Sequence, residues 1–409
     1  MEPGPERANA QLPLAQLKGE VERLVDELAA PLEEVARSIH AYAETAFREE
    51  RSAALLAGRL EAAGFRVRRG AAGMATAFLA DWSPAGDRAR PAVALLCEYD
   101  ALPGLGHACG HNLISAASWA AAVALKRALE PLGERFRGRL AVFGTPAEEE
   151  GGGKILLVEA DAFRDFDAAM MFHPATQDVA GSDALACVDV RYRFHGRAAH
   201  AAAAPQQGIN ALDAVLLFYD AVNALRQQTS PSARLHGIIT RGGDAPNVIP
   251  DLAETTWIVR ERDVESLLPL LERVHACARG AAQATGCRLE VEQGRVYAER
   301  VPNSVLEGLF ARNAARLGLR LGEPDPAGSG SSDIGNVSRV LPTLHPYLAI
   351  APADQPNHSR AFAEAAVSPR GLAVARTAAK LLAATALDLL FTPSLVDQAW
   401  EELRRRRRR

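Results

Sequence analysis

Five short apolar runs, with helical segments before and between them, set the fold class of this chain. The runs read "FRVRR", "ATAFLA", "AVALLCE", "LAVFG" and "AAMMFH". Apolar residues recur at helical spacing from Leu17 to about Ala46, from Ser52 to Ala63, and from about Asn112 to Leu129. Strands that alternate with helices form layered α/β domains. The sequence therefore predicts an α/β fold with a mostly parallel sheet.

Polar residues follow three of these runs at the point where each strand is expected to end. The segments are "CEYD", "GTPAEEE" and "FHP". In open parallel sheets, ligands bind outside the carboxyl ends of the strands. We therefore expect the functional site at this edge of the sheet.

The pattern changes between about Cys187 and Arg300. This stretch contains alternating strand-like runs and two long helical segments, near residues 208–228 and 265–285. Such a pattern is typical of a separate small α+β domain inserted into the first one. Strands of the first domain resume with "LPTLHPYLAI". We expect a discontinuous large domain (residues 1–186 and 303–398), an inserted domain (187–302) and a basic tail (399–409).

Length and charge agree with a two-domain protein that does not bind nucleic acid. The chain has 409 residues, more than single cores usually reach. Its net charge is -4, which does not indicate a nucleic-acid partner. The first residues do not show a basic start followed by an apolar run, and uncharged stretches are shorter than the about 20 apolar residues that span a bilayer. We expect neither a signal peptide nor a membrane span.

The cysteines indicate a reducing compartment, and the tail is expected to be disordered. The 5 cysteines are odd in number, widely spaced and without a CxxC pair, which favours a cytoplasmic location over a disulfide framework. The arginines Arg404 to Arg409 repel one another, so we expect a solvated, disordered end. The alternative is that these arginines bind phosphate groups or membrane lipids.

Side chains that bind metals gather at the predicted strand ends and in one later loop, "QPNHSRAF". They are Cys109, His111, Glu148, Glu149, Glu150, His173 and His358. Thiolate, imidazole and carboxylate are ligands of Zn²⁺ and related divalent ions. A helix is expected just after Cys109, and its N-terminal partial charge would favour the thiolate. Cys109 alone could be a buried thiol beside incidental histidines, but several such residues at one edge favour a metal site.

The segment "PAEEEGGGK" indicates a general base beside a metal. Two adjacent carboxylates on an irregular turn can point one at a metal and the other at a water molecule. A phosphate-binding loop is excluded, because Ile155 follows Lys154 and Glu148 replaces the first glycine of that motif.

These residues carry a resemblance to a known family. "CEYDALPGLGHACGHNL", "GTPAEEEGGGK", "FHP", "GRAAHAAAAPQQGINALDA", "NVIPD", "GSSDIGNVS" and "NHSRAF" resemble the dinuclear metal-dependent amidohydrolases related to aminoacylase and carboxypeptidase G. The branch is that of indole-acetyl-amino-acid hydrolases, β-alanyl-lysine dipeptidases and aminobenzoyl-glutamate hydrolase. The resemblance runs from about Glu33 to Ala383.

The resemblance implies a role for each matching residue. The metal ligands would be Cys109, His111, Glu149, His173 and His358, holding two divalent ions, Zn²⁺ or Mn²⁺. Glu148 would be the general base, and Asp100 would orient the ligands. The inserted domain would be a lid that forms a homodimer. His200 would reach the neighbouring active site to stabilise the tetrahedral intermediate, while Asn247 and Arg260 would hold a substrate carboxylate.

Two positions depart from the family pattern. Glu150 stands where relatives begin their glycine run, so the choice of Glu148 and Glu149 rests on their distance from Pro146. Asn112 replaces the Asp of the plant-hormone hydrolases, which favours the dipeptidase and aminobenzoyl-glutamate side. We expect a metal-dependent hydrolase that cleaves N-acyl amino acids or small dipeptides with a free carboxylate. A catalytically silent binding or scaffold protein is the alternative.

Overall fold

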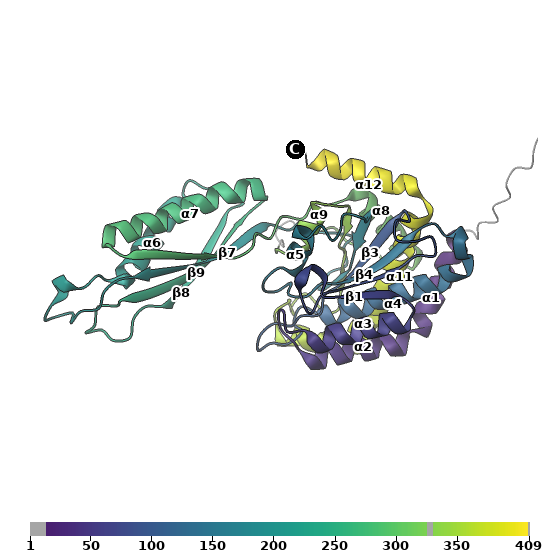
Figure 1. The fold of residues 1–409 in the computed structure, drawn as a ribbon, viewed down its shortest axis with the longest axis horizontal. Helices are drawn as coiled ribbons and strands as arrows, with labels where there is room; N and C mark the ends of the chain where they lie inside the picture. The colour runs from purple at the N-terminus through teal and green to yellow at the C-terminus, as the bar shows by residue number, and fades with distance from the viewer. Residues whose placement is uncertain (1–13, 325–329, 408–409) are drawn as a thin grey trace, which may run out of the picture. The chain divides into compact units, whose positions relative to one another are not determined.

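The computed structural model describes residues 14–324 and 330–407. They form two compact units (Figure 1). The large unit contains the chain up to Ser182, residues 301–324 and the chain from Val337 onward. The small unit contains Asp183–Arg300 and residues 330–336.

The large unit is built on a six-stranded sheet with the order β1-β2-β4-β3-β5-β11. The strands are β1 Arg66–Arg69, β2 Phe78–Trp82, β3 Ala92–Cys97, β4 Arg139–Gly144, β5 Ala168–Met170 and β11 Thr343–Leu344. From β4 to β11 the neighbours run parallel, whereas β1 and β2 are antiparallel. Both β3 and β4 are buried along their whole length, which explains why their sequences are continuous apolar runs. The predicted α/β fold with a mostly parallel sheet is confirmed.

A second, two-stranded parallel sheet pairs segments that lie far apart in the sequence. It consists of β6 His173–Ala175 and β12 Tyr347–Ala349. The expected strand "LPTLHPYLAI" is therefore split, with β11 in the large sheet and β12 beside His173.

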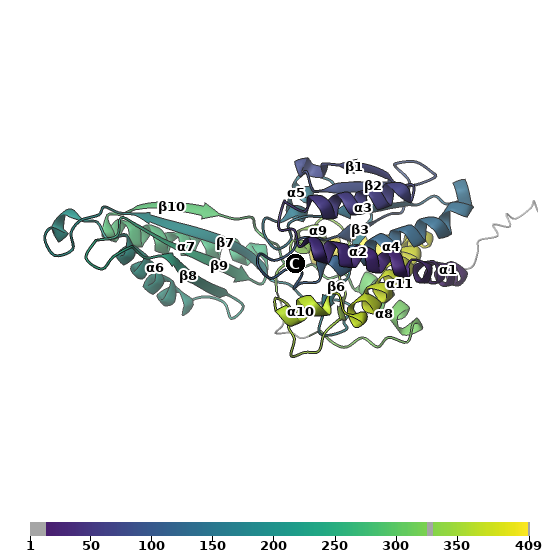
Figure 2. The same ribbon diagram turned by 90° about the horizontal axis from the view of Figure 1, so that it is seen from below.

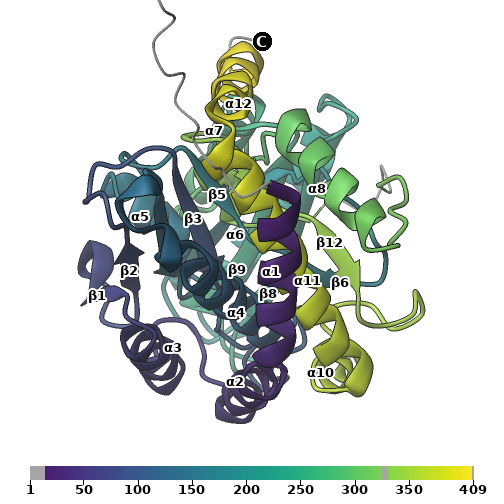
Figure 3. The ribbon, with the colours of Figure 1, turned by 90° about the vertical axis from the view of Figure 1, so that its right-hand side faces the viewer.

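Helix α4, His111–Leu129, is the core helix of the large unit. Its residues are buried on nearly all sides, because it packs against β3 and β4 and against four helices, α1 Leu14–Glu27, α2 Ala29–Tyr42, α3 Glu50–Ala62 and α11 Pro369–Phe391. Figure 3 shows α4, α1 and α11 side by side. The other α-helices of the large unit are α5 Gly153–Glu159, α8 Ser304–Arg316, α10 Arg360–Ala365 and α12 Pro393–Arg406, and α9 Ile334–Ser338 begins in the part of the chain that belongs to the small unit.

The helical segment expected from Leu17 to Ala46 forms two helices rather than one. The break lies at Leu28, between α1 and α2. Pro31 lies in the first turn of α2, where its missing N–H is tolerated. In a continuous helix the Pro31 ring would clash with the carbonyl of Glu27, so the chain restarts instead.

The small unit is an antiparallel sheet with two helices on one face. The strand order is β10-β7-β9-β8, and Figure 2 shows these strands from the face without helices. The elements are β7 Ala186–His195, α6 Ala211–Arg226, β8 Arg234–Arg241, β9 Leu252–Glu261, α7 Val264–Thr285 and β10 Arg288–Gln293. Its core forms where alternate residues of β7 and β9, such as Tyr192 and Trp257, pack against Phe218 of α6.

The expectation of a disordered basic end is wrong for the part of the tail that the structure describes. Helix α12 continues to Arg406. It is anchored by the buried side chains of Val396, Ala399 and Leu403, and Arg406 Nε donates to Glu402 Oε1 at 2.9 Å. Cations in the last turn also interact favourably with the helix dipole. Arg408 and Arg409 lie outside the described residues.

None of the helices in the described residues is, by itself, long and apolar enough to cross a membrane. The pair α11 and α12 passes that test only when joined across a bend of 98°. Most of α11 is buried in the core of the large unit.

Candidate metal centre

The predicted ligands in the large unit come together at the carboxyl edge of its sheet. Glu98 and Asp100 follow β3, and the turn carrying Glu148 and Glu149 follows β4. His173 begins β6, shortly after β5, and His111 is the first residue of α4. His358 lies in the loop before α10, where its backbone N–H donates to Ala108 O at 2.9 Å.

Cys109 lies at the centre of this cluster. Its Sγ is 3.6 Å from His173 Nε2 and 3.7 Å from His358 Nε2. Three groups of donor atoms among the described residues are close enough to share an ion: Cys109, His111 and His173; Cys109, Glu149 and His358; and His111, Glu148 and Glu149. The structure therefore brings together all five predicted ligands and Glu148.

The imidazoles are oriented as metal-ligating histidines usually are. His111 Nδ1 lies 3.0 Å from both the backbone oxygen and Oδ1 of Asp100. His173 Nδ1 lies 2.7 Å from Pro174 O. When Nδ1–H donates to such an oxygen, Nε2 keeps its lone pair for a metal. In both residues Nε2 faces the cluster.

Buried polar atoms without partners show that the cluster fits a cation. Among the described residues, neither His111 Nε2 nor Glu149 Oε1 has a hydrogen-bond partner. His111 Nε2 lies 3.4 Å from Glu98 Oε2, 3.8 Å from Glu149 Oε1 and 3.9 Å from Glu148 Oε2. Buried polar groups left in this way are unfavourable unless an ion satisfies them. The residues present therefore fit divalent metal ions.

Asp100 acts on two of the ligands at once. Besides its contact with His111, its Oδ2 accepts a hydrogen bond of 2.9 Å from the backbone N–H of Glu149. Burial raises the pKa of Asp100, but the charge of His111 and these hydrogen bonds lower it by more than burial raises it. The pKa of Asp100 therefore lies below its usual value. Asp100 therefore holds both His111 and the turn that carries Glu149.

The pKa shifts indicate that protons and metal ions compete for this site. Burial, together with the charge of Glu149, raises the pKa of the Cys109 thiol to about 12. The thiol is therefore protonated near neutral pH, contrary to the thiolate expected from the helix N-terminus, and a bound cation would favour the thiolate. Burial lowers the pKa of His173 to about 4, which keeps this imidazole neutral and able to bind metal. For His111 burial also lowers the pKa, but Asp100 and Glu98 outweigh it and raise the pKa well above the usual value.

Two charged residues near the site were not predicted as members of it. Glu98 and Lys154 are both buried, and Lys154 Nζ lies 2.5 Å from Glu98 Oε1. The position of Glu98, two residues before Asp100 at the end of a strand, was a readable signal because such residues share one face. Lys154 follows the glycine run of "EEEGGGK", and nothing in the sequence around it indicates that Glu98 is its partner.

The third acid of "EEE" does not face the cluster. Glu150 is exposed, whereas Glu148 is buried and Glu149 nearly so.

Asn357 is a further residue that the sequence did not indicate, and its Nδ2 donates to Cys109 Sγ at 3.8 Å.

The three predicted substrate-binding residues lie in the small unit, and not all at one place. His200 and Val248 form an isolated β-bridge, and Ala201 N donates to Asn247 O at 3.0 Å, so the His200 and Asn247 segments are neighbours. Arg260 lies near the other end of β9, where its Nη1 donates to Ser331 Oγ at 2.6 Å. Within one chain the structure does not bring Arg260 together with His200 and Asn247.

Comparison with known proteins places this chain among metallopeptidases. Residues 186–285 match the peptidase dimerisation domain of the M20 family. The chain is 41% identical to the mouse Xaa-Arg dipeptidase, over 98% of this chain and 95% of that protein. It is 36% identical to one of the p-aminobenzoyl-glutamate hydrolase subunits from Escherichia coli, over 70% of this chain and 62% of that protein.

A solved structure supports the fold. A dinuclear metal-binding peptidase of the M20 family from Bacillus subtilis has a TM-score of 0.63 and 20% identity, over 90% of this chain and 99% of that one. The alternative of a catalytically silent scaffold is not supported, because the similar proteins are hydrolases and the donor cluster is intact. The chain therefore belongs to the M20 family of peptidases and is a metal-dependent hydrolase of amide bonds.

Proposed function

We propose that this enzyme is a dipeptidase that releases a basic C-terminal amino acid from small dipeptides. The observation that carries its chemistry is the buried donor cluster around Cys109 with Glu148 beside it. The preference for a basic residue is supported by the similarity to the Xaa-Arg dipeptidase, which extends over nearly the whole chain, whereas the similarity to the aminobenzoyl-glutamate hydrolase covers less of both chains.

Two divalent ions, Zn²⁺ or Mn²⁺, would be held by the predicted ligands. Cys109 and His111 with His173 form one donor group that could hold an ion, and Cys109 with Glu149 and His358 forms another. When bound, such ions polarise the scissile carbonyl and acidify water. Thiolate and imidazole suit zinc, and the carboxylates also suit manganese.

Glu148 would act as the general base. Its side chain is buried and its Oε2 lies 3.9 Å from His111 Nε2, at the edge of the donor cluster. A carboxylate in this position can take a proton from the attacking water and pass it to the leaving amine. His200 of a second subunit would stabilise the oxyanion, and Asn247 and Arg260 would bind the substrate carboxylate.

The substrate preference can be measured with a panel of amides. The metal-loaded enzyme would be given Ala-Arg, Ala-Lys, Ala-Glu, N-acetyl-arginine and p-aminobenzoyl-glutamate, and amino acid release would be followed. We expect the highest kcat/KM for Ala-Arg and Ala-Lys. A site that pairs with the charge of a basic side chain would discriminate against substrates without that charge, because its own polar groups would then be left unpaired. A higher kcat/KM for p-aminobenzoyl-glutamate would contradict the proposed preference.

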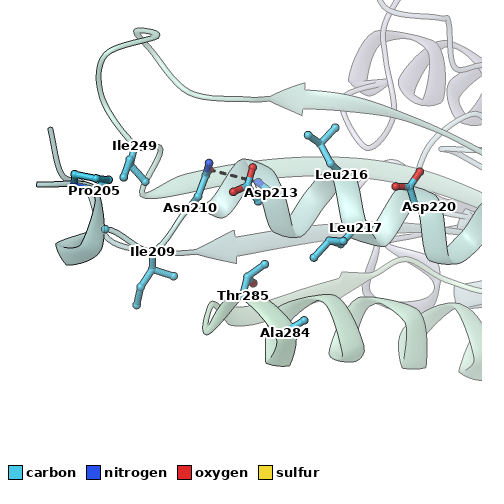
Figure 4. A pocket seen from close by; sticks show the side chains of 11 residues that line it. Pro205, Ile209, Asn210, Asp213, Leu216, Leu217, Asp220, Ile249, Ala284 and Thr285 are labelled. Atoms are coloured by element: carbon cyan, nitrogen blue, oxygen red, sulfur yellow. Dashed lines mark hydrogen bonds between the residues drawn. The ribbon is translucent and has the colours of Figure 1, made fainter. Parts of the chain in front are cut away.

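We also propose a homodimer formed through the small unit. Strand β8 is an edge of the sheet, and its Ile238 is 66% exposed. On the adjoining helix α6, the exposed Leu216 and Leu217 border an open pocket of about 660 Å³, together with Asp213 and Thr285 (Figure 4). An uncovered edge strand beside exposed leucines is typical of a surface that pairs with a second copy.

A charge on β8 is expected to weaken this dimer. Ile238 lies near the middle of β8, so a two-fold axis there would bring the two Lys side chains of Ile238→Lys close together. Light scattering after gel filtration should show a monomer for Ile238→Lys. Val291→Lys on the opposite edge strand β10 is the control, and it should remain dimeric. If Val291→Lys dissociates the dimer and Ile238→Lys does not, the interface does not lie at β8.

A cytoplasmic location remains a proposal. It is supported by the cysteines, since none of the five forms a disulfide bond in the described structure. Recovery of the enzyme from a membrane or secreted fraction of its cells would contradict it.

A further inference from the structure

Glu49 is a buried carboxylate that contacts the catalytic turn from a distant part of the sequence. It is the N-cap residue of α3, and its side chain is fully buried. Its Oε1 accepts a hydrogen bond of 2.8 Å from the backbone N–H of Ala147, 98 residues away. Ala147 is the residue immediately before Glu148.

Ala147 has a backbone conformation that needs support. Its φ is +60°, in the left-handed region that residues with a side chain rarely adopt. Such a conformation persists only where the surroundings determine it. The Ala147 carbonyl is held as well, because it accepts from Gly152 N at 2.9 Å and Gly153 N at 3.3 Å. Glu49 therefore supplies the contact on the N–H side.

Glu148 is thus flanked by two peptide N–H groups that buried carboxylates hold. On one side Glu49 accepts from Ala147, and on the other Asp100 accepts from Glu149 at 2.9 Å. The two carboxylates come from different elements, α3 and the segment after β3. Because the peptide groups on both sides are held, the backbone at Glu148 is held too, and with it the direction in which its side chain leaves the backbone.

We propose that Glu49 is a positioning residue that holds Glu148 in its catalytic orientation through the N–H of Ala147. This inference rests on the proposed role of Glu148 as general base. Misplacement of a reacting group by about 1 Å can lower a rate by about a hundredfold. Loss of Glu49 should therefore lower kcat, while KM and metal affinity stay close to those of the wild type, because Asp100 still holds Glu149.

The first variants separate the hydrogen bond from the charge. Glu49→Met fills the same space but cannot accept the Ala147 N–H effectively, and kcat is expected to fall by about ten- to a hundredfold. Glu49→Gln keeps an oxygen acceptor and is expected to retain most of kcat. Burial, together with the charge of Asp100, raises the pKa of Glu49 to about 7, so the protonated acid that Gln imitates is already populated near neutral pH. Metal binding, measured by calorimetry, should not change in either variant.

Glu44 offers a matched control. Its carboxylate also accepts backbone N–H groups near α3, from Arg51 and Ser52 at 2.9 Å, but it does not touch the catalytic turn in the described contacts. Glu44→Met should keep a wild-type kcat in the folded enzyme. A loss equal to that of Glu49→Met would show that Glu49 acts only through α3 and would overturn the inference.

A double-variant comparison provides the decisive readout. If Glu49 acts through Glu148, then Glu49→Met should lower kcat in the wild type but have no further effect on Glu148→Gln. Losses that multiply in the double variant would overturn the inference. If Glu49→Met does not fold, Glu49→Asp, which shortens the reach to Ala147, takes its place in the same comparison.

Failure of this inference differs from failure of the proposed function. If Glu148→Gln is impaired and Glu49→Met has an unchanged kcat, Glu49 is not a positioning residue. If Glu148→Gln itself keeps the wild-type rate, the general-base assignment is wrong, and the Glu49 inference falls with it.

Discussion

The Glu148→Gln enzyme is expected to hydrolyse its best dipeptide at least about a hundredfold more slowly than the wild type, the scale of general-base catalysis. Gln has nearly the shape of Glu but cannot take a proton from water. Metal binding should persist in the variant, because the five predicted ligands are unchanged and Glu148 belongs to only one of the three donor groups. The measurement is kcat with saturating substrate, together with metal content by elemental analysis.

The third acid of the same turn provides the control. Glu150 is exposed, and Glu150→Gln makes the same chemical change two residues away. It is expected to keep kcat within about twofold, since the change lies outside the buried cluster. A greater loss of kcat in Glu150→Gln than in Glu148→Gln would show that Glu148 is not the general base.

Lys154→Met is expected to lower the free energy of unfolding of the metal-free enzyme by about 3–5 kcal/mol. Lys154 Nζ lies 2.5 Å from Glu98 Oε1, and both side chains are almost completely buried. The variant would leave the Glu98 charge without this partner in a cluster that also contains Asp100, Glu148 and Glu149. Urea unfolding in the presence of a chelator measures the loss.

Two further variants isolate the charge effect. Glu98→Gln in the Lys154→Met background should recover much of the lost stability, because the uncompensated charge is then removed. Lys126 forms a comparable 2.8 Å pair with Glu130, but Glu130 is 61% exposed, so Lys126→Met should change stability by less than about 1 kcal/mol. Similar losses for Lys126→Met and Lys154→Met would contradict this account.

Much of the fold and the metal cluster could be predicted because both follow from local patterns. Continuous apolar runs identified β3 and β4, and the polar residues after them had to meet where parallel strands end at one edge. Cys109, His111, Glu149 and His173 were found in this way. His358 follows no long strand, and only the ligand chemistry of its side chain and the resemblance pointed to it.

The remaining features depend on contacts between distant segments. The Glu49 and Ala147 contact spans 98 residues, and no periodicity near Glu49 indicates a partner. The pair of Glu98 and Lys154 likewise joins distant segments, the end of β3 and the first turn of α5. The helical tail was missed because like-charge repulsion was weighed without the apolar residues before it, such as Leu403, which are buried. The roles of His200, Asn247 and Arg260 stay predictions.

Metal removal tests the central claim most directly. The wild-type enzyme would be stripped with a chelator, shown to be metal-free by elemental analysis, and assayed on Ala-Arg before and after addition of Zn²⁺ or Mn²⁺. We predict that hydrolysis disappears in the metal-free protein and returns as two equivalents of metal bind, because Cys109, His111, Glu149, His173 and His358 form the site. Undiminished hydrolysis by protein that contains no metal would contradict the assignment.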